Sequence, residues 1–454
     1  MQRTRFLALM LCLGSALLAG CGGSSGFSSP AGTPSTSLSI RDTPPAGVDV
    51  LSFEITVTGA VLQPGNVSLI SSPLNVEIKK LEATTAYLSG ANVPPGNYSS
   101  IQVTFANPDL TILNNSGAAI GSNCANGAVC ELKPTLNSAS VNFSGTPFPL
   151  TINPSGTTGL VLDFDLSNSI QNNLSVTPTI TFAQLPAVQG TGELEEIEYT
   201  GQVKSVGSSQ FTVQTALSGA TLTVSVNSNT QWEDFASCTT NDIRCLGTGG
   251  QTVQVELGHM TDGSYLAKEV ELEANSNEQE VEGVVYSVDT ATQCKLVVLD
   301  EEPAVNGVAV GNWATVTLVN SSFSIAHNDL DASAFSFNSS ADLLVGQELE
   351  VRPVSATSSP TGVLITTDRV RLRMSQYTAH VAAISGNNFT VDNLPGLFTQ
   401  AGITQIQVNT SSQTKFENVS GVAGLTVGAT VSVEGLLFKT PGGPVLVAKE
   451  VRKR

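Results

Sequence analysis

The C-terminal half of the chain repeats one pattern of short strand-like segments, and this repeat constrains the fold more than any other feature. Equivalent openings fall at Gly201, Gly283 and Ala379, so each unit spans about 80 to 95 residues, a period typical of repeat architectures. Within each unit, runs such as VQVEL and VSVEGLL are rich in Val and Leu and end at polar turns. Such runs favour β-strands over helices. The repeat therefore predicts three copies of one small all-β unit.

The three units are expected at residues 197–274, 279–374 and 376–454. We predict that each closes into a small β-barrel, because an open apolar sheet edge invites aggregation. Their Gly-x-Val-x-x-Val openings and the Ala-Lys-Glu-Val endings at 267–270 and 448–451 resemble domain-of-unknown-function family 5666. That resemblance implies tandem domains of bacterial envelope and secreted proteins, without an activity to transfer.

A different β-rich module precedes the repeats, from residue 37 to 187. It contains an Asp-Thr-Pro start, the strand-like run LSFEITVTGAVL, a Pro-Gly-Asn-Tyr turn and a late Asp-Phe-Asp-Leu. This order resembles the bacterial domain-of-unknown-function family 4382. The resemblance implies an immunoglobulin-like or prealbumin-like β-sandwich. The predicted fold class is all-β, one sandwich followed by three tandem small barrels.

The first 20 residues read as a secretory signal, with Arg3 and Arg5 before an apolar core that is too short to span a bilayer. The ending Leu-Ala-Gly before Cys21 resembles the lipobox of bacterial lipoproteins, which implies diacylglycerol on that sulfur and cleavage before it. Residues 21–36 form a Gly/Ser/Pro tether. The alternative is an ordinary signal peptide with a chance cysteine. Gly22 after the cysteine resembles the outer-membrane sorting signal of lipoproteins. We therefore expect a lipid-anchored protein of the cell envelope, in the outer membrane, on either the periplasmic or the surface side.

The chain is acidic, with a formal net charge of −18 and only 13% charged residues. An acidic surface repels phosphate backbones, and the only basic run is at 449–454, so we expect no nucleic-acid partner. The charge fits a soluble exported surface, or else specific binding of cations or cationic partners.

Five cysteines remain after the leader and Cys21. Cys124 and Cys130 form one close pair and Cys238 and Cys245 another, and an oxidising envelope would let each close a small ring. A zinc site is the alternative, although neither spacing is C-x2-C. Cys294 precedes a strand-like run, and we interpret it as a core thiol rather than a nucleophile.

Asp163 and Asp165 in LDFDLS are weak candidates for a metal or an acid–base pair, because side chains two apart share a strand face. No D-x-D-x-D-G loop supplies the further oxygens that Ca2+ takes, so a solvated or turn-capping role is the alternative. The larger aromatics of the repeats serve either as core residues or as a stacking platform for sugars or bases; they are Trp232, Phe235, Trp313, Phe389 and Phe416.

No catalytic motif stands out. His259, His327 and His380 fall at non-equivalent places in three units, which disfavours one shared metal or triad site. We therefore expect a non-catalytic envelope protein that binds or displays protein or polysaccharide partners, with no cofactor. The alternatives are a carbohydrate-binding or carbohydrate-active envelope protein that uses the two aspartates, and a calcium-dependent adhesion module.

Overall fold

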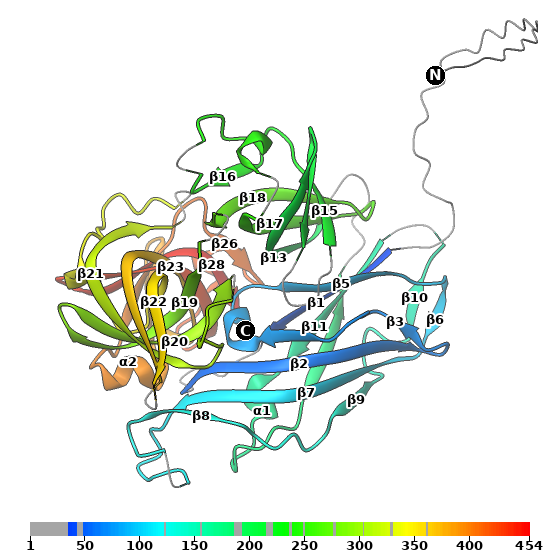
Figure 1. Ribbon diagram of the computed structural model, residues 1–454. Helices are drawn as coiled ribbons and strands as arrows, with labels where there is room; N and C mark the ends of the chain where they lie inside the picture. The colour runs from blue at the N-terminus through cyan, green and yellow to red at the C-terminus, as the bar shows by residue number, and fades with distance from the viewer. Residues whose placement is uncertain are drawn as a thin grey trace, which may run out of the picture.

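The computed structural model is all-β, as the sequence predicts. It describes residues 35–42, 49–121, 124–154, 157–185, 193–214, 221–235, 238–247, 250–275, 278–302, 304–326, 330–359 and 362–454. The helices within these ranges are single turns: α1 (Leu166–Ser169), α2 (Gly396–Gln400), η1 (Ile78–Leu81), η2 (Ile243–Cys245), η3 (Ser340–Asp342) and η4 (Val422–Gly424). Figure 1 shows the N-terminal unit in blue and cyan, with the repeats in green, yellow and red beside it.

The N-terminal unit contains two larger sheets. One begins with β12 (Ile180–Gln184), β11 (Thr157–Phe164), β1 (Ser35–Asp42) and β5 (Ala86–Asn92), in that order, and continues into the first repeat through a parallel pairing of Ala86 in β5 with Glu198 in β13 (Glu193–Val206). The other is formed by β3 (Val67–Ser68), β2 (Val50–Gln63), β7 (Ser100–Leu113), β8 (Val129–Leu132), β4 (Leu74–Glu77) and β9 (Ser140–Phe143). A short ladder joins β6 (Gly96–Tyr98) to β10 (Leu150–Ile152). β1 runs parallel to β11 and antiparallel to β5.

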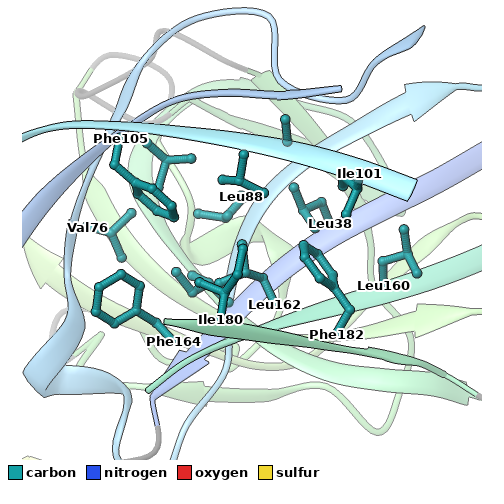
Figure 2. Packing of buried hydrophobic residues seen from close by; sticks show 14 of the residues in the cluster. Leu38, Val76, Leu88, Ile101, Phe105, Leu160, Leu162, Phe164, Ile180 and Phe182 are labelled. Carbon is teal, nitrogen blue, oxygen red and sulfur yellow. The ribbon is translucent and has the colours of Figure 1, made fainter. Parts of the chain in front are cut away.

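Side chains from both sheets build the core of this unit. Figure 2 shows Phe105 from β7 and Leu38 from β1 facing the same interior as Phe164 from β11 and Phe182 from β12. The alternation in β7 explains this, because Ile101, Val103 and Phe105 fall on one face of the strand and are all buried.

The first repeat contains β13 (Glu193–Val206), β14 (Gln210–Gln214), β15 (Thr221–Ser225), β16 (Gln231–Glu233), β17 (Thr252–Met260) and β18 (Tyr265–Ala274). β13 pairs antiparallel with β14 and β17. β14 pairs with β15, β17 pairs with β18, and β18 runs parallel to β15.

The same pairing order recurs twice. The second repeat contains β19 (Glu280–Thr290), β20 (Gln293–Glu302), β21 (Trp313–Ile325), β22 (Glu348–Ser359) and the first part of β23 (Gly362–Ser385). The third contains the rest of β23, β24 (Asn388–Asp392), β25 (Ile406–Asn409), β26 (Lys415–Glu417), β27 (Thr430–Thr440) and β28 (Gly443–Lys453). β23 runs unbroken from the second repeat into the third.

Each repeat has its own apolar core, and a further small cluster joins units. It combines Leu51 and Leu113 of the N-terminal unit with Val297 of the second repeat and Leu397 of α2. Apolar contact across these boundaries means that the units pack against one another and are not connected by linkers alone.

Residues 77–84, around η1, make polar contacts with the part of β23 where the second repeat passes into the third. Thr378 Oγ1 donates to Glu82 Oε2 at 2.9 Å, and the Ala83 main-chain N donates to Gln376 Oε1 at 3.0 Å. Arg454 at the C-terminus, which lies at the centre of the view in Figure 1, donates to the Glu82 carbonyl oxygen. The N-terminal unit therefore contacts the repeats at their junction.

Candidate binding cleft between the repeats

The structure confirms both predicted disulfides. Cys124 bonds to Cys130, and Cys238 bonds to Cys245, with Cα–Cα distances of 5.7 and 5.4 Å. Cys294 is a free thiol that is 1% exposed, and burial raises its pKa to about 12. A thiol with so high a pKa holds almost no thiolate at neutral pH, which fits a core residue.

Cys21, residues 22–34 of the predicted tether and His327 lie outside the described residues, whereas the last two tether residues, Ser35 and Thr36, begin β1. Among the residues that the structure describes, no helix is long and apolar enough to cross a membrane. His259 is buried, with its Nδ1 3.1 Å from Ser37 Oγ, and burial lowers its pKa to about 4.

Asp163 and Asp165 have separate partners. Arg41 Nε donates to Asp163 Oδ2 at 3.0 Å. Asp165 lies just beyond β11 and caps α1, because the Asn168 main-chain N donates to its Oδ1 at 3.0 Å. Capping of this kind is the role that the sequence analysis sets against a metal site.

Most of the larger aromatics of the repeats belong to cores. Phe235 and Phe389 are buried in the first and third repeats, and Trp232 and Phe416 pack against the same clusters. Trp313 instead lines a surface recess of about 250 Å3.

The Ala-Lys-Glu-Val motif occupies equivalent positions in β18 and β28. In the first repeat, Ala267 and Val270 are buried in the core, and Thr230 Oγ1 donates to the Ala267 carbonyl at 2.8 Å. In the third repeat, Thr414 Oγ1 donates to the Ala448 carbonyl at the same distance of 2.8 Å. The buried Ala and Val anchor the motif, which leaves its Lys and Glu side chains to line the surface between the two repeats.

Those charged side chains line two adjoining hollows, which we call the polar cleft. The hollows measure about 360 and 340 Å3. Both are lined by Glu256, Lys268, Lys415, Lys449 and Glu450. The larger one is also lined by residues of the N-terminal unit, so the polar cleft lies where that unit meets the first and third repeats.

Ion pairs cross and border the polar cleft. Lys449 Nζ lies 3.0 Å from Glu256 Oε2 and so links the third repeat to the first. Lys415 Nζ lies 3.3 Å from Glu450 Oε2, and Arg452 pairs with Glu417. These pairs hold long polar side chains in defined positions, which suits a preformed site.

The carboxyl groups of the polar cleft differ in their electrostatics. Burial raises the pKa of Glu434 to about 8, and the nearby charge of Glu198 adds to the shift. Burial acts to raise the pKa of Glu417, but the positive charges of Arg452, Lys415 and Arg41 together outweigh burial and hold the pKa below its usual range. At neutral pH the polar cleft therefore contains a protonated carboxyl, Glu434, and an ionised carboxylate, Glu417.

A second charged region joins the first repeat to the second. β18 and β23 have the same alternation with opposite charges, Val-Glu-Leu-Glu at 270–273 and Val-Arg-Leu-Arg at 370–373. Arg373 Nη2 lies 2.8 Å from Glu273 Oε1, and Arg373 Nη1 also pairs with Glu271. This complementarity is visible in the sequence as a sign reversal between equivalent strands, although the sequence analysis did not use it.

Carboxylate oxygens that lie close enough to hold a metal ion also occur here. Glu273, Glu280 and Glu350 each offer one oxygen within 4.8 Å of the others. The sequence analysis missed these residues because they come from three strands of two repeats.

Two family models match the chain. Residues 34–178 match Domain of unknown function (DUF4382), and residues 200–271 and 379–452 match Domain of unknown function (DUF5666). The chain joins a DUF4382 domain to DUF5666 domains. Both resemblances stated from sequence are thereby confirmed.

The matches place both Ala-Lys-Glu-Val motifs inside DUF5666 stretches. The polar cleft therefore lies between the two matched DUF5666 domains and borders the DUF4382 domain. The second repeat lies between the matched stretches and has the same strand pairing.

Two solved structures are similar over part of the chain. One is titled "drosophila Unr CSD456", with 12% identity, a TM-score of 0.15, and coverage of 57% of this chain and 97% of that chain. The other is a Streptococcus pneumoniae multidomain protein with nucleic acid binding domains, with 10% identity, a TM-score of 0.12, and coverage of 57% and 73%. These TM-scores are too low to support an argument. The search of curated proteins found no match.

Proposed function

We propose that this protein is a non-catalytic, lipid-anchored component of the bacterial cell envelope that binds polysaccharide in the polar cleft. The observation that carries the proposal is the arrangement of the two Ala-Lys-Glu-Val motifs, because Lys268 and Lys449 from two DUF5666 domains line one cleft. A single copy of the motif would contribute to a site within its own domain only. Because two copies line the same cleft, the two domains together form one composite site.

The lining of the polar cleft is polar and suits a hydroxyl-rich ligand. Amide groups of Asn227, Asn229 and Gln413 lie beside lysines and carboxylates. Amides and charged groups of both signs offer the donors and acceptors that sugar hydroxyls need, and the volume is in the range of small-ligand sites.

We infer that the DUF4382 domain is a β-sandwich and that each repeat is a small barrel. The sandwich is supported by the shared core of the two sheets. The barrel is supported by the pairing of β13 with β14, β14 with β15, β15 with β18, β18 with β17, and β17 with β13 again. A rigid scaffold of this kind would hold the polar cleft in one shape.

The lipid anchor is proposed on the sequence alone. Cys21 after Leu-Ala-Gly, with a Gly/Ser/Pro tether behind it, fits a lipidated mature N-terminus that leaves the globular part free of the membrane. Mass spectrometry of the N-terminal peptide tests this proposal. We expect a diacylglyceryl group on Cys21. An unmodified Cys21, or cleavage at another position, would contradict the proposal.

Binding is tested with the full chain, solubilised in detergent. We expect it to co-sediment with purified peptidoglycan or to be retained on immobilised lipopolysaccharide core oligosaccharide. Competition by the soluble oligosaccharide separates specific retention from adsorption. Absence of retention on both materials would refute the polysaccharide proposal.

A carbohydrate-active role is a second candidate, and the state of Glu434 favours it. A carboxyl with a pKa near 8 remains protonated at pH 7 and can act as a general acid, and the ionised Glu417 lines the same hollow. These carboxylates differ from Asp163 and Asp165, which the sequence analysis considered for that role. Release of reducing ends from peptidoglycan by the wild type, lost in Glu434→Gln, would favour the enzyme; binding without release favours the non-catalytic proposal.

A further inference from the structure

A small cavity between the first and second repeats is lined by oxygen-bearing side chains. It measures about 30 Å3, enough for one or two water-sized groups. Its lining residues are Thr200, Gln254, Glu273, Glu280, Glu282, Asp300 and Glu350. None of these residues lines the polar cleft, so the two sites are separate.

Three strands bring the nearest carboxylates together. Glu273 comes from β18 of the first repeat, Glu280 begins β19, and Glu350 lies in β22 of the second repeat. Their nearest oxygen atoms all lie within 4.8 Å of one another. Three carboxylates at that separation repel one another strongly unless a cation or protons lie between them.

The carboxyl group of Glu280 provides independent evidence for a ligand in the cavity. The Glu280 side chain is only 6% exposed, and one oxygen, Oε1, pairs with Arg369. The other oxygen, Oε2, is buried and has no hydrogen-bond partner among the residues that the structure describes. A buried carboxylate oxygen without a partner is costly, and Glu280 lines the cavity itself.

The neighbouring cationic side chains pair with carboxylates that line or border the cavity, and each of the three clustered carboxylates has an arginine partner. Arg373 pairs with Glu271 and Glu273. Arg371 Nη1 lies 3.1 Å from Glu350 Oε2. On the other side, Lys80 Nζ lies 2.8 Å from Glu282 Oε2 and 3.5 Å from Asp300 Oδ2.

Negative charge still exceeds positive charge around the cavity. The carboxylates of this cluster are Glu271, Glu273, Glu280, Glu282, Asp300 and Glu350, and the cationic side chains paired with them are Lys80, Arg369, Arg371 and Arg373. An additional positive charge would relieve the repulsion among these carboxylates.

We propose that this cavity binds one Ca2+ ion that links the first repeat to the second. Glu273, Glu280 and Glu350 supply carboxylate oxygens, and Thr200 and Gln254 line the same space. An all-oxygen, carboxylate-rich site selects a hard cation, and Ca2+ tolerates irregular geometry better than Mg2+. Because the ligands come from both repeats, the ion stabilises their docking.

Calorimetric titration of the full, chelator-treated chain with CaCl2 and with MgCl2 tests the proposal. We expect one Ca2+ per chain, weaker Mg2+ binding, and a higher Tm in CaCl2 than in chelator. Glu280→Gln is expected to weaken Ca2+ binding by at least about tenfold. The double variant Asp163→Asn, Asp165→Asn is the matched control and should bind Ca2+ as the wild type does.

Three results would overturn the proposal: no Ca2+ uptake by the wild type at millimolar concentration, tighter binding of Mg2+ than of Ca2+, or unchanged affinity in a folded Glu280→Gln. If Glu280→Gln does not fold, Glu273→Gln replaces it, because the Glu273 side chain is less buried, with 13% exposed. The same affinity loss is expected there, and unchanged affinity in that variant also refutes the site. None of these results depends on saccharide binding.

Discussion

Lys80 Nζ of the DUF4382 domain lies 2.8 Å from Glu282 Oε2 of the second repeat, and this ion pair joins parts of the chain 202 residues apart. Its side chains are 24% and 15% exposed. The pKa of Lys80 is raised because its carboxylate neighbours outweigh the opposing effect of burial. The pair is thus one of the contacts that hold the N-terminal unit on the repeats.

We expect Lys80→Met to destabilise the chain. Loss of the ammonium removes the 2.8 Å contact with Glu282, and the cost should be roughly 1–3 kcal/mol, between the values for exposed and fully buried pairs. Chemical denaturation of Lys80→Met, Glu282→Gln and the double variant measures the coupling. Additive effects of the two substitutions would show that the pair does not stabilise the interface.

The two Ala-Lys-Glu-Val motifs should depend equally on their threonines. Thr230→Val and Thr414→Val each remove a hydroxyl that donates to a buried motif carbonyl at 2.8 Å. We expect each change to lower the free energy of unfolding by about 1–3 kcal/mol, because a buried acceptor loses its donor. Thermal denaturation checks this expectation, and Thr410→Val, which removes an exposed hydroxyl, is the control. A large loss in only one of the two motif variants would argue against their equivalence.

Stability should fall as the pH rises from about 5 to about 8. Burial raises the pKa of Glu434 and of Glu348 to about 8, well above the usual value of 4.5. A carboxyl with a higher pKa in the folded chain binds its proton more tightly when folded, so its stabilising contribution is complete below the unfolded pKa and is lost as the pH passes the folded one.

Differential scanning calorimetry across this pH range checks the sign. We expect Tm to fall by several degrees between pH 5 and pH 8, and Glu434→Gln, which cannot ionise, to flatten the profile. A Tm that rises over the same range in the wild type would contradict this prediction. It would mean that these carboxyl groups are ionised in the folded chain and stabilised there by neighbouring positive charges.

The sequence predicts local features of this protein well. The spacing of Cys124 and Cys130 is short enough for a small ring, and the disulfide forms. The repeated Ala-Lys-Glu-Val motif marks equivalent strands because its Ala and Val must be buried in each copy. These signals depend on residues that are near one another in the chain.

The packing between units was harder to predict, because it depends on residues far apart in the sequence. Arg373 and Glu271 are 102 positions apart, and no local pattern states that their strands meet. Glu273, Glu280 and Glu350 share a cavity only after two repeats dock. A comparison of charge signs at equivalent strand positions, such as VELE against VRLR, is the signal that points to this docking.

The central claim is that the polar cleft between the DUF5666 domains binds polysaccharide. Its most direct test is calorimetric titration of the full chain with lipopolysaccharide core oligosaccharide and with soluble peptidoglycan fragments. We expect saturable binding of at least one of them, lost in Lys268→Ala, Lys449→Ala but retained in Lys204→Ala, a control on the exposed surface of the first repeat. No saturable binding by the wild type, or equal binding by the folded double variant, would contradict the account.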